Sequence, residues 1–234
     1  MLRLVPKQSA APELVDGGIE NHRLLRSNLR DMARANRWLG GNRAVLRRVG
    51  GWLAALPREH RATILDVATG GGDLPLTLHH WSVRQDRAVA LLASDLSRDV
   101  LAVAQQELRG RPVRLLRHDA LQMPFADRSI DIVTCSQALH HFPLDEAVRL
   151  LRELARVARI GVIVNDLRRS YPAYWGARLL AAGPVSALSR HDGPLSVLRA
   201  YTPAEVADLV KRAALPAQVR QARGFRLEIE LSKG

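Results

Sequence analysis

Apolar runs of strand length alternate along the chain with segments whose apolar residues recur at helical spacing. This alternation indicates strands and helices in turn. Strands joined by helices need crossover connections, so they favour a mostly parallel sheet and an α/β fold. The predicted strands are 62–67, 88–94, 112–117, 130–136 and 160–164, followed by two terminal strands near 217–221 and 225–231.

The predicted helices lie before, between and after these strands. Residues 21–57 have a helical pattern that Gly40 and Gly41 interrupt. Asp145 and Glu146 begin a strongly amphipathic helix, where acids in the first turn suit the helix dipole. Further helices are predicted from the glycine loop to about 81, over 97–108, and from the capping box that begins at 202.

The pattern divides the chain into two parts. Residues 1–57 are predicted to be an N-terminal arm, loosely ordered over 1–20, followed by helices that cap the sheet. Residues 58–234 are predicted to be the sheet domain. Prolines and glycines break its rhythm at about 168–200, which indicates an inserted helical lid.

Composition excludes several classes of protein. With 47% hydrophobic residues among 234, the chain can bury a sizeable core and is not disordered as a whole. No apolar stretch reaches the length of a membrane span, and residues 1–15 lack the apolar core of a secretory signal. The single cysteine, Cys135, excludes an internal disulfide. We therefore expect a reducing, cytoplasmic location.

The formal net charge of +12 raises the question of an anionic partner. The basic residues are nearly all arginine and are spread along the whole chain, which a biased genome composition also explains. We expect no nucleic-acid partner, and at most a weak peripheral contact with anionic membrane.

The most informative segment is 66–73, Asp-Val-Ala-Thr-Gly-Gly-Gly-Asp, where a strand ends in an acid and a glycine turn begins a helix. Glycines let a ligand approach the backbone closely. Asp95 follows the second strand, where an acid can hold ribose hydroxyls, and Asp119 follows the third, where an acid can accept from an adenine amino group. Each acid alone could cap a turn or helix. Together they favour an adenosine site.

The charges beside the glycines indicate which adenosine cofactor binds. Asp66 and Asp73 would repel the pyrophosphate of a hydride carrier, and the Lys-Ser/Thr of a P-loop is absent. S-adenosylmethionine carries an ammonium and a sulfonium group, so two nearby carboxylates suit it.

These residues resemble the motifs of a known protein family. Segment 66–73 resembles the first motif of class I S-adenosylmethionine-dependent methyltransferases, with Ala68 where many members have glycine. Asp95, the Asp119-Ala120 pair and segment 130–142, with its Ala-Leu-His-His-Phe ending, match the later motifs in order and spacing.

Two other parts of the sequence resemble particular groups within this family. Residues 35–39, Ala-Asn-Arg-Trp-Leu, resemble the helix that closes over the cofactor in methyltransferases of the ubiquinone and menaquinone pathways. Further along the chain, a few residues are similar to methyltransferases that modify phenolic or polyketide products of type III polyketide synthases, namely Asn165-Asp166-Leu167 and Arg190-His191-Asp192-Gly193 before Tyr201-Thr202-Pro203.

The resemblance implies a Rossmann-like, seven-stranded sheet with an antiparallel last hairpin, and S-adenosylmethionine as the cofactor. It implies that Gly70 and Gly72 contact the amino-acid part of the cofactor, Asp95 the ribose, and Asp119 the adenine. The full set of predicted cofactor contacts is Asp66, Ala68, Thr69, Gly70, Gly72, Asp95, Leu96, Asp119, Ala120 and Ser136.

Methyl transfer to a phenolic oxygen benefits from a base, because a phenol has a pKa near about 10. His140 and His141 follow the fourth strand, at the edge where ligands of parallel sheets bind, and Asp166 follows them at the end of the fifth. We predict that one of the three is the base. Alternatively, a histidine packs against the cofactor or donates to a carbonyl, and Asp166 caps the next segment.

No metal site is expected. Metal-dependent catechol methyltransferases place an acid after the fourth strand and an Asp-Asn pair after the fifth. Here Ser136-Gln137 and Asn165-Asp166 occupy these places, so one acid is missing and the pair is reversed.

The acceptor is predicted to meet the lid and the helix before the sheet, since aromatic residues of the lid suit a pocket wall. Ordinary packing on the sheet is the alternative explanation, and composition alone favours it. The predicted acceptor contacts are Asn36, Trp38, Tyr171, Trp175 and His191.

We therefore expect a methyltransferase that acts on a small phenolic, quinol or polyketide hydroxyl, as a monomer or homodimer. C-methylation of a quinone-like ring, an RNA methyltransferase and a non-catalytic scaffold of the same fold remain alternatives. The region after the fourth strand lacks the Asn/Asp-Pro-Pro-aromatic motif of base-nitrogen methylation, which counts against RNA.

Overall fold

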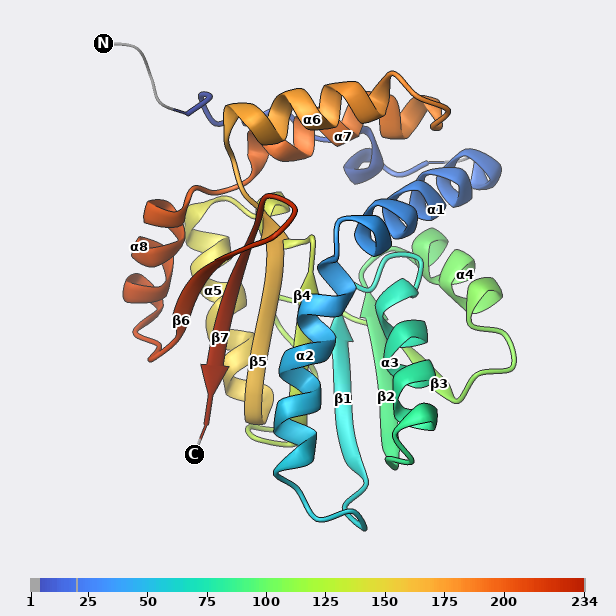
Figure 1. Cartoon of the computed structure of the whole chain (residues 1–234), viewed down its shortest axis with the longest axis vertical. Helices are drawn as coiled ribbons and strands as arrows, with labels where there is room; N and C mark the ends of the chain where they lie inside the picture. The colour runs from blue at the N-terminus through green and yellow to red at the C-terminus, as the bar shows by residue number, and fades with distance from the viewer. Residues whose placement is uncertain (1–4, 20, 234) are drawn as a thin grey trace.

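The computed structural model describes residues 5–19 and 21–233, and within them the strands form one seven-stranded sheet in the order β3-β2-β1-β4-β5-β7-β6 (Figure 1). Strands β1 to β5 are parallel, while β7 is antiparallel to both β5 and β6. The predicted Rossmann-like fold with its antiparallel last hairpin is confirmed. The strands are β1 (Ala62–Val67), β2 (Val89–Asp95), β3 (Val113–Arg117), β4 (Ile130–Ser136), β5 (Ala158–Leu167), β6 (Gln218–Ala222) and β7 (Arg226–Ser232).

Helices cover both faces of this sheet. α2 and α3 pack on one face through an apolar cluster that includes Val49 and Leu78, and α5 and α8 pack on the other through Leu154 and Leu209. The helices are α1 (His22–Trp38), α2 (Gly41–Ala54), α3 (Asp73–Arg84), α4 (Arg98–Glu107), α5 (Leu144–Val157), α6 (Tyr171–Ala181), α7 (Ala187–Arg199) and α8 (Pro203–Ala213), with short 3-10 helices η1 (Leu14–Gly17) and η2 (Leu139–His141).

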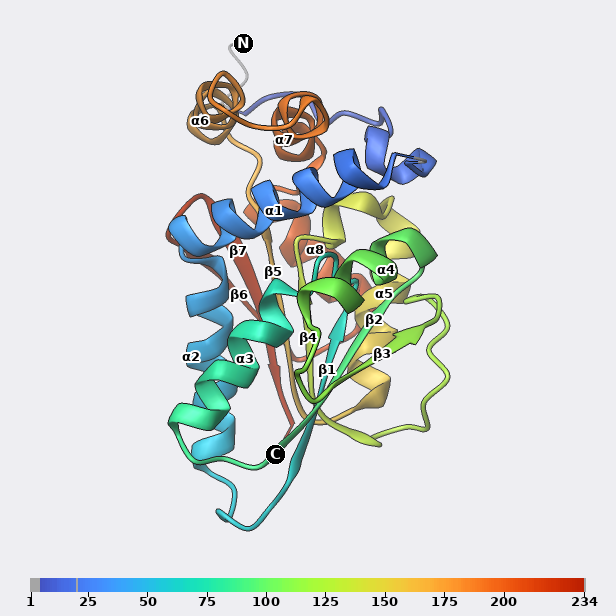
Figure 2. The ribbon, with the colours of Figure 1, turned by 90° about the vertical axis from the view of Figure 1, so that its right-hand side faces the viewer.

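The carboxyl ends of the parallel strands are covered by two layers. Figure 2 shows α1 running across the strand ends, with α6 and α7 above it. Local capping signals fix where the helices of this region begin. Ser170 caps α6 by accepting from the Ala173 amide, and Thr202 forms a capping box with Glu205 at the start of α8. Helices α6 and α7, inserted between β5 and α8, lie where the sequence predicts the lid.

The N-terminal segment differs from the loosely ordered arm that the sequence predicts. Over residues 5–19 it packs on α7, where the amides of Leu14 and Val15 donate to the Asp192 carboxylate at 3.0 and 3.2 Å. Asp192 thereby satisfies the free amides of η1 from a distant element. Residues 1–4 and 20 of the predicted arm lie outside the described residues.

Each described helix is too short or too polar to cross a bilayer.

Candidate functional site

The glycine loop after β1 has the backbone that its sequence predicts. Gly70 and Gly72 have φ values of +55° and +80°, in the left-handed region that glycine adopts at little cost. A Cβ on Gly72 would come within 2.8 Å of Leu108 Cδ1. Ala68, at the place where many members of the resembling family have glycine, also has a positive φ of +54°. The loop thus begins α3 directly at the end of β1.

Two carboxylates hold this loop. Asp66 is buried, and its two oxygens accept from the Thr69 and Thr134 hydroxyls at 2.7 Å each. Asp95 accepts from the Gly70 amide at 3.2 Å and from the Ser97 amide at 3.0 Å. Asp66 therefore ties Thr69 of the loop to Thr134 of β4, and its predicted contact with the cofactor stays a prediction.

The electrostatics of the loop fit a cationic ligand. Burial raises the pKa of Asp66 to about 7, and the nearby carboxylates of Asp73 and Asp95 add to the rise. Burial also raises the pKa of Asp95. A positive charge in this crevice would relieve the repulsion among the three carboxylates. The residues present therefore fit S-adenosylmethionine, whose ammonium and sulfonium groups supply such charge.

The other predicted cofactor residues follow neighbouring strands at the same edge. Leu96 is 59% exposed after β2, and Asp119 is exposed after β3 with Oδ1 accepting from the Leu121 amide at 2.8 Å. Ser136 ends β4, where its hydroxyl accepts from Asn165 at 3.1 Å. Because β3, β2, β1 and β4 are adjacent and parallel, these residues and the glycine loop share one edge of the sheet.

Helix α1 closes one side of this edge. A Cβ on Gly71 would lie 3.3 Å from Leu29 Cβ, so α1 packs directly on the glycine loop. Asn36 donates to Asp73 at 3.3 Å and accepts from Gln137 at 2.6 Å and Arg226 at 2.8 Å. The sequence predicts Asn36 as an acceptor contact. Its buried amide ties α1 to α3, to the residue that follows β4 and to β7, and its contact with the acceptor stays a prediction.

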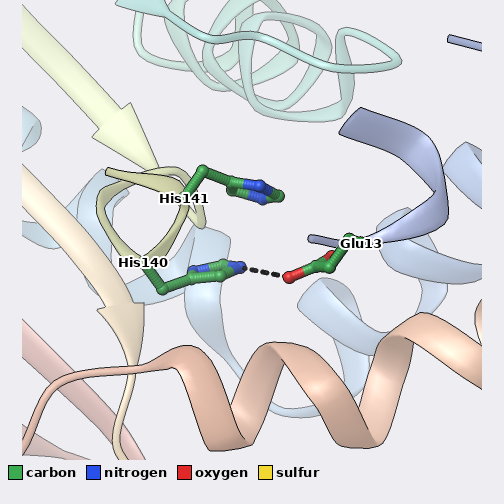
Figure 3. Close-up of side chains that lie close together, drawn as sticks. All are labelled: Glu13, His140 and His141. Atoms are coloured by element: carbon green, nitrogen blue, oxygen red, sulfur yellow. Dashed lines mark ion pairs between the residues drawn. The ribbon is translucent and has the colours of Figure 1, made fainter. Parts of the chain in front are cut away.

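The histidines after β4 form a network with three carboxylates. His140 Nδ1 lies 2.7 Å from Asp166 Oδ1, and its backbone amide donates to Asp166 Oδ2 at 2.9 Å. On the other side of the ring, Nε2 lies 3.5 Å from Glu13 Oε1 (Figure 3). His141 Nδ1 lies 2.8 Å from Asp16 Oδ1. Each imidazole is therefore oriented by a carboxylate on its Nδ1.

The buried His140 is held as a cation. Burial alone would lower the pKa of His140, but the carboxylates of Asp166 and Glu13 raise it to about 10. Burial likewise opposes ionisation of Asp166, yet the His140 charge holds the pKa of Asp166 below its usual value. A protonated imidazole cannot accept a further proton. The assignment of a base among His140, His141 and Asp166 stays a prediction, and the charged His140–Asp166 pair favours His141, which is partly exposed.

Within the described residues, three side chains at this site, those of Glu13, His140 and His141, are close enough to one another to hold a metal ion. Donor atoms of Glu13, His140 and His141 all lie within 4.8 Å of one another. The proton on His140 supplies the positive charge between Glu13 and Asp166 in this state. That no metal is required stays a prediction.

An apolar cavity of about 230 Å³ lies between α1 and the α6–α7 layer, with His140 and His141 in its wall. Small residues of α6 line it, namely Ala173, Gly176 and Ala177. Its volume and polarity suit an apolar ring. Larger apolar lining residues are Met32, Leu39, Leu180, Val197 and Phe225, and the wall also includes the charged side chains of Glu13, Asp31, Asp192 and Arg226.

The residues predicted to contact the acceptor do not line this cavity. Trp38 and Trp175 are 85% and 63% exposed, Tyr171 is also exposed, and His191 is exposed beside Asp192. The stripe of large residues on α6 points outward because its small residues face the cavity. Periodicity identifies the two faces of a helix, but not which one the fold buries.

Sequence reasoning missed Glu13 and Asp16. Both lie in a segment with little pattern, and only the fold brings them to His140 and His141. Gln137 was also missed, although its position directly after β4 and its positive φ of +55° are typical of residues at such a site.

Comparisons with known proteins agree with this geometry. Residues 64–161 match the family model described as a methyltransferase domain. The chain is 31% identical over 175 residues to the demethylmenaquinone methyltransferase of Porphyromonas gingivalis, covering 70% of this chain and 68% of that protein. It is 39% identical over 102 residues to the demethylmenaquinone methyltransferase of Thermus thermophilus, covering 42% and 43%.

Solved structures share the fold at lower identity. A S-adenosylmethionine-dependent methyltransferase from Aquifex aeolicus has a TM-score of 0.54 and 18% identity, covering 79% of this chain and 87% of that one. The magnesium protoporphyrin IX methyltransferase of Synechocystis has a TM-score of 0.53 and 18% identity, covering 86% and 84%. With the loop geometry and the Porphyromonas gingivalis relative, these findings show that the chain belongs to the class I S-adenosylmethionine-dependent methyltransferases of the menaquinone-biosynthesis type.

Proposed function

We propose that the enzyme methylates a hydroxyaromatic ring, a quinol or phenol, that carries an apolar substituent. The observation that carries this proposal is the apolar cavity with two carboxylate-oriented histidines in its wall. An apolar ring would be desolvated there at little cost, while its hydroxyl could meet the two histidines in the wall.

The cofactor-holding residues are those at the strand ends. We propose that the Gly70 and Gly72 loop holds the amino-acid part, Asp95 the ribose, and Asp119 with Ala120 the adenine. When bound, S-adenosylmethionine supplies a methyl group on a sulfonium, which is already activated for transfer. The chain then contributes mainly position and orientation, and Leu29 of α1 packs against the loop that would hold the cofactor.

The proton of the acceptor hydroxyl goes to His141 in this proposal. Because the Asp16 carboxylate accepts from Nδ1, the neutral His141 ring keeps Nε2 as its proton acceptor. The neighbouring His140 cation, with its ring centroid 4.4 Å from that of His141, favours negative charge on the acceptor oxygen. Asp166 and Glu13 keep that cation in place.

We propose a ring carbon as the methylated atom. A deprotonated hydroxyaromatic ring shares its negative charge between the oxygen and ring carbons, so the same base serves methylation at either atom. The relatives are demethylmenaquinone methyltransferases, a name that supports carbon. Methylation of the oxygen, which the sequence analysis favours, is the second candidate.

Asp95→Ala is expected to weaken S-adenosylmethionine binding by about 10- to 100-fold, because a charge-assisted hydrogen bond to a ribose hydroxyl is lost. Isothermal titration calorimetry measures this. Asp145→Ala on α5, which removes an exposed carboxylate away from the strand ends of the cofactor site, is the control and should bind as the unsubstituted enzyme does. Equal affinity of the two variants would contradict the ribose assignment.

Product analysis tests the acceptor class. The enzyme is incubated with S-adenosylmethionine carrying a carbon-13 methyl group and with reduced naphthoquinones or alkylphenols in detergent micelles. We expect a mass gain of one methyl and a carbon-13 shift typical of a methyl on a ring carbon. A methoxy shift would favour the second candidate. No transfer to any of these acceptors by enzyme that binds the cofactor would overturn the proposal.

A further inference from the structure

Three exposed apolar residues surround the opening of the cavity. Leu39 at the end of α1, Leu180 on α6 and Phe225 in the β6–β7 hairpin all line the cavity, yet they are 36%, 55% and 39% exposed. The cavity therefore reaches the surface where these three elements meet. An acceptor entering here passes between apolar side chains.

The apolar surface continues outward from this opening along α6. Tyr171, Trp175 and Leu179 follow one another at four-residue spacing, so they lie on one side of the helix, and they are 43%, 63% and 77% exposed. Trp38, next to Leu39, is 85% exposed. Figure 1 shows α6 in the outermost layer of the molecule. So much exposed aromatic and aliphatic surface in one region indicates an interaction site.

The acids that line the cavity, Glu13, Asp31 and Asp192, are buried, and the exposed charges on the segments around its opening have one sign. The chain segments that carry the opening, 32–58, 167–191 and 209–227, contain no Asp or Glu, although the whole chain has 23. Each of them has an exposed arginine, Arg37, Arg178 or Arg223. Exposed apolar side chains among arginines suit a surface that is apolar inside and anionic outside.

We propose that this surface, the outer face of α6 with Trp38, Leu39 and Phe225, docks on an anionic lipid bilayer. Docking would turn the cavity opening toward the membrane, from which an acceptor with an apolar tail could enter without crossing water. The route for the acceptor rests on the proposed function, whereas the docking itself does not. A second copy of the chain fits less well, because two such arginine-bearing faces without acids would repel each other.

Vesicle sedimentation of the full chain tests the docking. The probes are vesicles of phosphatidylcholine, with or without about one third phosphatidylglycerol. We expect binding to the anionic vesicles that is at least about tenfold stronger than to neutral ones and that falls with added salt. Trp175→Ser with Leu179→Ser should weaken it about tenfold or more, because less apolar area is buried.

Matched controls come from α3. Val83 is 67% exposed there, so Val83→Ser removes a comparably exposed apolar side chain, and Arg84→Glu makes the same charge change as Arg178→Glu. The α6 variants should lose vesicle binding while the α3 variants keep it, and all should keep their affinity for S-adenosylmethionine, which shows that they fold. Equal loss in both sets, or no binding by the unsubstituted chain, would overturn the docking proposal.

Two further outcomes are distinguishable. Sedimentation velocity without lipid that shows a dimer abolished by the α6 substitutions would assign the surface to a second copy instead and would overturn lipid docking. The vesicles contain no acceptor, so binding is measured independently of catalysis. Failure of the proposed function would appear as absent methylation in micelles with vesicle binding intact.

Discussion

His141→Ala is expected to lower kcat by about 100-fold or more and to leave S-adenosylmethionine affinity within about twofold. General-base catalysis contributes roughly 10²- to 10⁴-fold, and of the two described histidines that line the cavity, His140 is already protonated between its carboxylates. Steady-state kinetics with a hydroxyaromatic acceptor, together with calorimetry of cofactor binding, measure the two quantities.

A base can be distinguished from a merely structural residue. Added imidazole should restore part of the activity of His141→Ala, and the deficit should shrink as the pH approaches about 10, where a phenolic acceptor ionises without help. His80→Ala, an exposed histidine on α3, is the control and should retain full activity. A deficit that is unchanged by imidazole and pH would show that His141 only shapes the site.

Asp166→Asn is expected to lower the free energy of unfolding by about 3 kcal/mol or more, because it leaves the buried His140 cation without its closest partner. Urea denaturation measures this change. The control is Asp208→Asn, which breaks the exposed Asp208–Arg212 pair and should cost less than about 1 kcal/mol. Similar costs for the two substitutions would contradict the buried ion pair.

The cost of Asp166→Asn should depend on pH in a direction that the pKa of His140 fixes. That pKa is raised from its ordinary value of 6.5 to about 10. The stabilisation of the folded protein by the His140–Asp166 pair is therefore complete below a pH of about 6.5, and it is lost as the pH rises through about 10. The difference in the free energy of unfolding between the unsubstituted enzyme and Asp166→Asn, measured with urea, should accordingly shrink over this range. A difference that grows with pH would show that His140 is neutral.

Local sequence signals predict the fold because they act between neighbours. The alternation of strands and helices, the glycines at 70 and 72 and the Thr202 capping box each require only a few adjacent residues. Asp95 and Asp119 could be assigned to one edge because parallel strands end together. This regularity explains why the cofactor edge is predicted from the sequence in more detail than the acceptor site.

The acceptor site depends on contacts between distant segments, which no local pattern contains. Glu13 reaches His140 because Asp192 and Arg199, both far along the chain, hold the η1 segment in place. The outward direction of Trp175 follows from how α6 packs on α7, not from its own periodicity. The protonated state of His140 likewise needs both carboxylates in place and cannot be inferred from the His-His pair alone.

The central claim is that the donor binds at the glycine loop while the acceptor ring occupies the neighbouring apolar cavity. A crystal structure with S-adenosylhomocysteine and an alkylated hydroxyaromatic ligand tests it most directly. We predict adenosine between Asp95 and Asp119, and a ring hydroxyl within hydrogen-bond distance of His141 Nε2. A ring bound outside the cavity, or a cofactor bound away from the loop formed by Gly70 and Gly72, would contradict the account.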